Sequence, residues 1–166
     1  EIELISIRER DQRLKKTLGP VMDRYDYILI DCPPSLSMLT LNALCFANGV
    51  IVPMQCEYFA LEGLTDLVAS IRRVHNEKNP GLRIISILRV MFDPRITLQQ
   101  QVSEQLKKHF GDKVFNTIIP RNVRLAEAPS YGKPGVVYDR SSRGAMAYKA
   151  FADEIISRME AKKKNG

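Results

Sequence analysis

Four short apolar runs divide the chain, each rich in isoleucine, valine or tyrosine and bounded by Asp, Pro, Gly or charged residues. They cover Tyr27 to Ile30, Val50 to Val52, Ile84 to Val90 with interruptions, and Thr117 to Ile119. Runs that are apolar at successive positions are typical of strands buried on both faces, as in a parallel sheet. The pattern therefore predicts four strands.

Segments with helical spacing lie between and around these runs. Apolar residues recur every three or four positions in segments 14–22, 61–74, 98–110 and 148–159. Strands that alternate with helices of this length indicate βαβ units with right-handed crossovers. We predict an α/β fold, a mostly parallel sheet with helices on both faces. With no repeat and no low-complexity linker, residues 1–166 are expected to form a single domain.

Composition and charge narrow the classes of protein. The 166 residues carry 25 Lys and Arg against 19 Asp and Glu, and a net charge of +6 favours polyanionic partners. No apolar run approaches the roughly 18 residues of a membrane span. Cys32, Cys45 and Cys56 form no CxxC pair, so they are interpreted as buried thiols in a reducing compartment. With only His75 and His109 available as histidines, no zinc site is expected.

The most informative segment joins the first apolar run to Asp31, Cys32, Pro33 and Pro34. Ligands bind at the carboxyl ends of parallel strands, so Asp31 is expected in a crevice, where it can hold Mg²⁺ directly or through water. The two prolines would make a stiff loop able to sense a γ-phosphate. The alternative is an Asp that merely caps the following helix.

Two further segments follow predicted strands. The segment 55–63 places polar groups at the same sheet edge. Pro120, Arg121 and Asn122 follow a later strand and offer an apolar ring, a cation and a bidentate amide for a nucleobase. An ordinary loop is the alternative for this turn.

Taken together, these motifs resemble the ParA family of chromosome- and plasmid-partitioning ATPases, which are close relatives of MinD. Four stretches carry the resemblance, in order along the chain: YDYILIDCPPSLSMLTLNAL, PMQCEYFALEGL, IIPRNVRLAEAPSYGKP and YDRSSRGAMAY. They cover the chain from Tyr25 to about Met159. The run NVRLAEAPSYGKP looks most like the chromosomal branch.

The resemblance implies an ATP site with Mg²⁺. Asp31 would be the Walker B aspartate that holds Mg²⁺ through water, and Pro33 and Pro34 would belong to the switch loop. Pro120 and Asn122 would be adenine-side contacts, with Arg121 between them. The family forms a homodimer around two ATP molecules and binds DNA without sequence preference, and a centromere-binding ParB protein stimulates hydrolysis.

The family's DNA-contacting basic positions fall on Arg95 and Arg124. Both lie in basic stretches, since residues 72–95 hold six Lys or Arg against two acids and residues 121–143 hold five against two. Such clusters can be solvated faces only, but two of them together with the family match favour phosphate contacts.

One family motif is missing. The phosphate-binding loop of the form KGGVGKTT occurs nowhere in the sequence, and the first residue is Glu1 rather than Met. We therefore expect the C-terminal portion of a ParA-type ATPase domain, an incomplete P-loop NTPase-like fold that does not hydrolyse ATP alone. A missing sheet neighbour would also lower stability and favour self-association.

Three alternative functions account for part of the pattern. A truncated, non-enzymatic relative could bind DNA or a partner. A MinD-like protein would cycle on membranes, which the weak C-terminal amphipathicity and the Arg95 and Arg124 matches disfavour, so no membrane partner is expected. A phospho-receiver domain would need an acidic pair after an earlier strand, and no such strand is expected before Asp31, because Glu9 and Asp11 sit in helical spacing. The expected location is cytoplasmic and nucleoid-associated.

Overall fold

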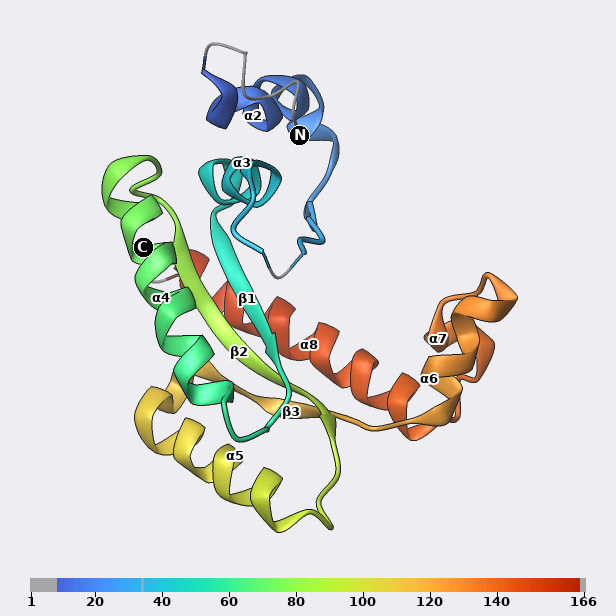
Figure 1. The fold of residues 1–166 in the computed structure, drawn as a ribbon. Helices are drawn as coiled ribbons and strands as arrows, with labels where there is room; N and C mark the ends of the chain where they lie inside the picture. Colours follow the sequence, from blue (N-terminus) through green and yellow to red (C-terminus); the bar gives the residue numbers. More distant parts are fainter. Residues whose placement is uncertain (1–8, 34, 165–166) are drawn as a thin grey trace. The chain divides into compact units, whose positions relative to one another are not determined.

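A three-stranded sheet in the order β1-β2-β3 organises the computed structural model, which describes residues 9–33 and 35–164 (Figure 1). The strands are β1 (Gly49–Met54), β2 (Arg83–Phe92) and β3 (Val114–Pro120). β2 and β3 are parallel, with Ile87 opposite Val114 and Phe92 opposite Pro120. The predicted α/β class with a parallel sheet is confirmed.

Helices precede, connect and follow the strands. In chain order they are η1 (Arg10–Gln12), α2 (Arg13–Leu18), η2 (Gly19–Arg24), α3 (Met38–Phe46), α4 (Ala60–Glu77), α5 (Thr97–Phe110), η3 (Gly111–Lys113), α6 (Val123–Glu127), η4 (Ala128–Tyr131), α7 (Gly135–Tyr138) and α8 (Arg143–Lys164). The chain groups into two compact units. The first unit comprises residues 1–50 and 65–85, and the second unit comprises residues 51–64 and 86–166.

The core of the first unit is an apolar cluster contributed by α3, α4 and the segment that enters β2. Its buried members are Leu44, Cys45, Ile71, Val74 and Leu82. One side-chain amide ties the surrounding backbone to this cluster through two hydrogen bonds. The side chain of Asn79 donates to the carbonyls of Leu44 (2.9 Å) and Ala47 (2.8 Å), which would otherwise end α3 without partners.

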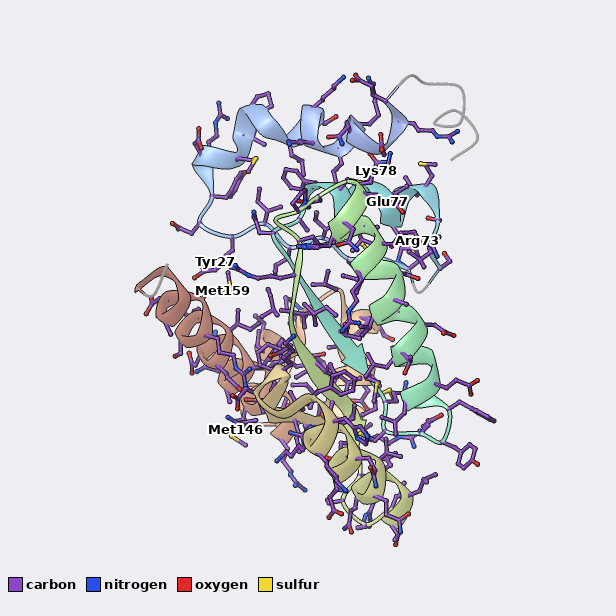
Figure 2. The ribbon with its side chains drawn as sticks, turned by 90° about the vertical axis from the view of Figure 1, so that its left-hand side faces the viewer. Tyr27, Arg73, Glu77, Lys78, Met146 and Met159 are labelled. Carbon is purple, nitrogen blue, oxygen red and sulfur yellow. The ribbon has the colours of Figure 1, made fainter. Side chains whose placement is uncertain are left out.

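The N-terminal helices of the first unit are held to α3 by Asn42. Its Oδ1 accepts from the Leu14 N–H (3.1 Å) and its Nδ2 donates to the Arg10 carbonyl (2.8 Å). Lys78, labelled in Figure 2, follows α4 and forms an ion pair with Asp11 at 2.8 Å. This pair lowers the pKa of Asp11. One buried amide and one ion pair therefore hold η1 and α2 in place.

In the second unit, α5 packs on one face of the sheet and α8 runs along the other, where it covers β3 (Figure 1). Phe115 of β3 is fully buried and meets Phe151 of α8 edge-to-face, with ring centroids 5.0 Å apart. Leu106 of α5 is also fully buried. The helices on both faces are those that the sequence predicts.

The prediction of a strand at Tyr27 to Ile30 is wrong. These residues have no regular structure, and Leu29 is 86% exposed. A strand is stabilised by hydrogen bonds to neighbouring strands, and within the described part of the chain the sheet contains only β1, β2 and β3. An apolar, β-branched sequence without a paired neighbour therefore stays irregular.

Candidate nucleotide- and phosphate-binding residues

Asp31 lies in the first unit, in the irregular segment that leads to α3, and its side chain is exposed. Pro33 is exposed beside it, and Pro34 lies outside the described residues. The segment ends at Ser37, whose hydroxyl caps α3 by accepting from the Thr40 N–H (3.4 Å). Ser37, not Asp31, is therefore the residue that caps this helix.

The surroundings of Asp31 fit a magnesium ion held mainly by a nucleotide. Mg²⁺ usually keeps several waters and takes one or two carboxylates plus substrate phosphates. A single exposed carboxylate matches that demand. Among residues 9–33 and 35–164, no group of three or more His, Cys, Asp or Glu side chains could hold a metal ion by itself.

The residues predicted to contact adenine lie in the second unit, where β3 ends at Pro120. The Arg121 N–H donates to the Phe92 carbonyl (3.1 Å), which fixes the turn to the end of β2. Asn122 caps α6, since its Oδ1 accepts from the Leu125 N–H (3.2 Å). The expected bidentate amide is therefore only half available, because capping uses the oxygen and leaves the Nδ2 donor.

Two glycines position α6. Leu125 of α6 packs against Gly135 of α7 and Gly144 of α8 so closely that a Cβ on either glycine would overlap its side chain. Neither glycine has a positive φ, so the requirement is for space rather than for backbone freedom. This contact sets the distance of Asn122 from the start of α8.

Arg95 projects from the β2–α5 loop and is 87% exposed. Its Nε donates to Asp93 Oδ1 (2.9 Å) and its Nη2 to Asp93 Oδ2 (2.7 Å), and its backbone N–H also reaches Oδ1 (3.0 Å). These hydrogen bonds from Arg95 lower the pKa of Asp93 to about 2. The carboxylate therefore stays charged at neutral pH and keeps the guanidinium in one orientation.

Arg124, in α6, is held between two acids. Its Nη1 donates to Glu127 Oε2 (3.0 Å), and its Nε lies 3.6 Å from Asp139 Oδ2. Glu127 also accepts from the Tyr138 hydroxyl (3.3 Å), and the pair with Glu127 raises the pKa of Arg124. Its side chain is 56% exposed, so both proposed DNA contacts remain open to solvent.

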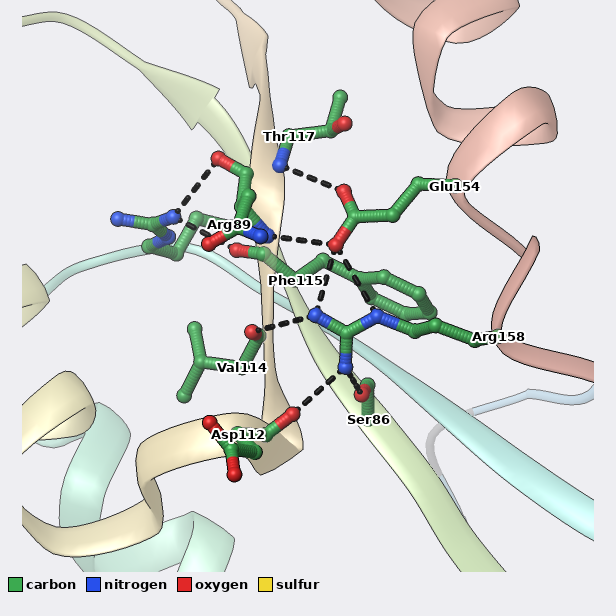
Figure 3. Close-up of polar contacts among 9 residues, drawn as sticks. Ser86, Arg89, Asp112, Val114, Phe115, Thr117, Glu154 and Arg158 are labelled. Atoms are coloured by element: carbon green, nitrogen blue, oxygen red, sulfur yellow. Dashed lines mark hydrogen bonds and ion pairs between the residues drawn. The ribbon is translucent and has the colours of Figure 1, made fainter. Parts of the chain in front are cut away.

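The basic stretch 72–95 is not one surface. Arg89, which belongs to it, is 1% exposed and points into the second unit. Its Nη1 donates to Ser103 of α5 (2.8 Å). Its Nη2 donates to the carbonyls of Phe115 (2.8 Å) and Asn116 (3.2 Å), on the β3 side (Figure 3). The sequence offers no account of this arginine, and the structure shows that it joins β2, α5 and β3.

A half-buried pair of charged side chains, which sequence analysis missed, fastens α8 to β3 (Figure 3). Glu154 accepts from the backbone N–H groups of Asn116 (2.9 Å) and Thr117 (2.8 Å), and Arg158 donates to Glu154 Oε1 at 2.7 Å. Arg158 also reaches the hydroxyl of Ser86 (2.7 Å). The i, i+4 spacing of Glu154 and Arg158 was the available signal, but it does not reveal burial.

No helix in the described ranges combines the length and the apolarity that a bilayer crossing requires.

Comparisons with known proteins agree with the motifs. Residues 1–84, just over half of the chain, match the family described as AAA domain. The chain is 54% identical to the chromosome-partitioning ATPase Soj of Treponema pallidum, over 95% of its length and 62% of that protein. It is 52% identical to the sporulation initiation inhibitor protein Soj of Bacillus subtilis, over 93% of its length and 61% of that protein.

Solved structures share the fold. The crystal structure of cobyrinic acid a,c-diamide synthase from Mycobacterium smegmatis with bound ADP and magnesium is similar with a TM-score of 0.79 at 32% identity, over 98% of this chain and 59% of that one. The chain thus spans about 60% of the length of the curated relatives it matches. On this evidence the chain belongs to the AAA-domain family and, as its motifs indicated, to the ParA/MinD superfamily.

Proposed function

We propose that the complete protein is a ParA-type partitioning ATPase and that this chain supplies its magnesium-binding acid, its adenine-side contacts and its DNA-contacting arginines. The observation that carries the proposal is the identity to Soj proteins, 54% and 52%, along at least 93% of the chain. The synthase from Mycobacterium smegmatis is only 32% identical, so it supports nucleotide binding rather than its own named reaction.

For the nucleotide, Asp31 is proposed to act on the magnesium side, and Pro120 and Asn122 are proposed to act on the adenine side. A bound Mg²⁺ would neutralise phosphate charge during phosphoryl transfer. Asp31 would hold its waters through an exposed carboxylate, and Pro33 and Pro34 would stiffen the adjoining switch loop. Pro120 would contact the base through its ring, and Asn122 would donate from Nδ2 to a ring nitrogen. No Gly-rich Lys-Thr loop occurs in this sequence, so hydrolysis is proposed for the complete protein only.

Binding and partners would follow from the same assignment. ATP would favour a homodimer, and the dimer would bind nucleoid DNA in the cytoplasm through Arg95 and Arg124 without reading base sequence. A ParB-type centromere-binding protein would stimulate hydrolysis and release the DNA. The exposed guanidinium of Arg95 supports this role, because phosphate contacts supply sequence-independent affinity.

Replacing Arg95 tests the DNA proposal. In the complete protein with ATP, Arg95→Ala should weaken binding to unrelated duplexes alike by roughly tenfold and lower the salt slope by about one. Fluorescence anisotropy across a salt series measures both quantities. Lys149→Ala, which removes the same charge from an exposed position on α8, should leave them nearly unchanged. Unaltered DNA affinity in Arg95→Ala would contradict the proposal.

The adenine side is tested by Asn122→Asp. The carboxylate keeps an acceptor for the Leu125 N–H, so α6 retains its cap, but the Nδ2 donor is lost. Nucleotide affinity should fall by about tenfold, the cost of one hydrogen bond in a buried site, without a lower melting temperature. Isothermal titration with ADP and thermal unfolding give the two values. Equal ADP affinity in parent and variant would remove Asn122 from the site.

A further inference from the structure

The two arginines proposed to contact DNA are held by carboxylates in different ways. Asp93 binds Arg95 along one edge of the guanidinium, through Nε and Nη2. Glu127 binds Arg124 at Nη1, and Asp139 faces its Nε. A guanidinium presents five N–H donors in a fixed plane, so the edge that is engaged decides what remains for a phosphate.

For Arg95, the outward edge remains available. Asp93 accepts hydrogen bonds from Nε and from one donor of Nη2. Among the described residues, no hydrogen bond from Nη1 is found. Two parallel donors, on Nη1 and Nη2, suit bidentate binding of a phosphate. Arg95 can therefore bind a phosphate while its bonds to Asp93 persist.

The loop that carries Asp93 is itself fixed. The Asp93 N–H donates to Gln99 Oε1 (2.7 Å), the Gln100 side chain donates to the Pro94 carbonyl, and the carboxylate receives the Arg95 backbone N–H. The Asp93 side chain is only 16% exposed. A long, exposed arginine would otherwise sample many rotamers, and ordering it on binding would cost affinity.

For Arg124, the carboxylates engage Nη1 and Nε. Glu127 occupies one donor of Nη1 and Asp139 lies against Nε, and each acid is anchored separately. Glu127 accepts from Tyr138, and Asp139 accepts from the backbone N–H (3.1 Å) and the hydroxyl (2.9 Å) of Ser141. A phosphate that binds both terminal nitrogens of Arg124 must therefore share Nη1 with Glu127 or displace it.

We propose that Asp93 is a positioning residue that presents Arg95 to a DNA phosphate, whereas Glu127 competes with the phosphate for Arg124. This inference rests on the proposed function. It assigns opposite effects to two acids that contact equivalent basic groups. Repulsion between Asp93 and a phosphate opposes positioning, but it acts across the guanidinium in solvent, where charges are screened over about 8 Å at physiological salt.

The test neutralises each acid in the complete protein with ATP and measures affinity for an unrelated DNA duplex across a salt series. Asp93→Asn should weaken binding about fivefold and lower the salt slope toward that of Arg95→Ala, although it removes a negative charge. Glu127→Gln should tighten binding about threefold. Asp153→Asn, an exposed acid on α8, is the control for net charge and should change affinity by less than about twofold.

A double variant separates positioning from disturbance of the loop. In an Arg95→Ala background, Asp93→Asn should cause no further loss. Two results for Asp93→Asn would overturn the inference: tighter DNA binding, or an equal loss of DNA affinity when the substitution is made in the Arg95→Ala background. Weaker DNA binding by Glu127→Gln would also overturn it. If the proposed DNA-binding role of Arg95 is itself wrong, Arg95→Ala alone will bind DNA as tightly as the parent. That result distinguishes a failure of the proposed function from a failure of this inference.

Discussion

Arg89→Ala should lower the free energy of unfolding by about 3–4 kcal/mol, because a fully buried side chain and its hydrogen bonds are lost together. Arg89 donates to Ser103, Phe115 and Asn116, and those acceptors would lose their partner inside the second unit. Burial itself lowers the pKa of Arg89, which shows that the charge is costly to bury. Removing the charge also removes this cost of burial, which offsets part of the stability lost with the hydrogen bonds.

Urea unfolding followed by circular dichroism measures this effect, with Arg89→Met as the informative companion. Methionine fills much of the space of the arginine stem but supplies no donor, so its cost should be roughly half that of alanine. Lys149→Ala serves again as the matched surface variant. If Arg89→Ala unfolds at the same urea concentration as the parent, the hydrogen bonds through β2, α5 and β3 do not stabilise the fold.

Glu154→Gln should lower the free energy of unfolding by about 3 kcal/mol at pH 7. Burial would raise the pKa of Glu154, but hydrogen bonds from Thr117, Asn116 and Arg158 outweigh it and hold the pKa at about 2. Its side chain is 15% exposed, so solvent screens these interactions little. Glutamine keeps one acceptor but turns an NH₂ group toward a donor.

The same pKa fixes the pH dependence. The folded value of about 2 lies below the ordinary 4.5, so the stability that Glu154 contributes is complete above about pH 4.5 and is lost as the pH falls toward 2. The difference in the free energy of unfolding between the parent and Glu154→Gln should therefore fall to roughly half of its pH 7 value by pH 3. Glu160→Gln, on the exposed side of the same helix, should show no such dependence. If the difference in unfolding free energy between the parent and Glu154→Gln did not change with pH, the lowered pKa of Glu154 would be refuted.

Much of the fold could be predicted from periodicity. The runs at Val50, Ile84 and Thr117 lie within β1, β2 and β3, and the segments 61–74, 98–110 and 148–159 lie within α4, α5 and α8. Helix α3 was missed because its residues are apolar on every side and show no amphipathic period. The run Tyr27 to Ile30 failed for the opposite reason, since strand propensity depends on a neighbour that a local pattern does not contain.

The candidate residues were identified by motif, but their partners were not. Nothing in the sequence shows that the side-chain oxygen of Asn122 caps a helix. Nor does it show that Arg124 lies between Glu127 and Asp139. The pairing of Asp93 with Arg95 is local and could have been inferred, because an Asp accepts readily from the backbone two residues on. The burial of Arg89 depends on α5 and β3, which come later in the chain.

The contact of Leu125 with Gly135 and Gly144 has an evolutionary consequence. Each glycine has an ordinary backbone conformation, so bulk alone disfavours an alanine there: the side chain of Leu125 at both positions, and also the Cβ of Asn122 at Gly144. A smaller residue at 125 would make room for an alanine at 135, whereas an alanine at 144 would still meet Asn122 closely. Substitutions at 125 and 135 are therefore expected to depend on one another, and 144 is the more restricted of the two glycine positions.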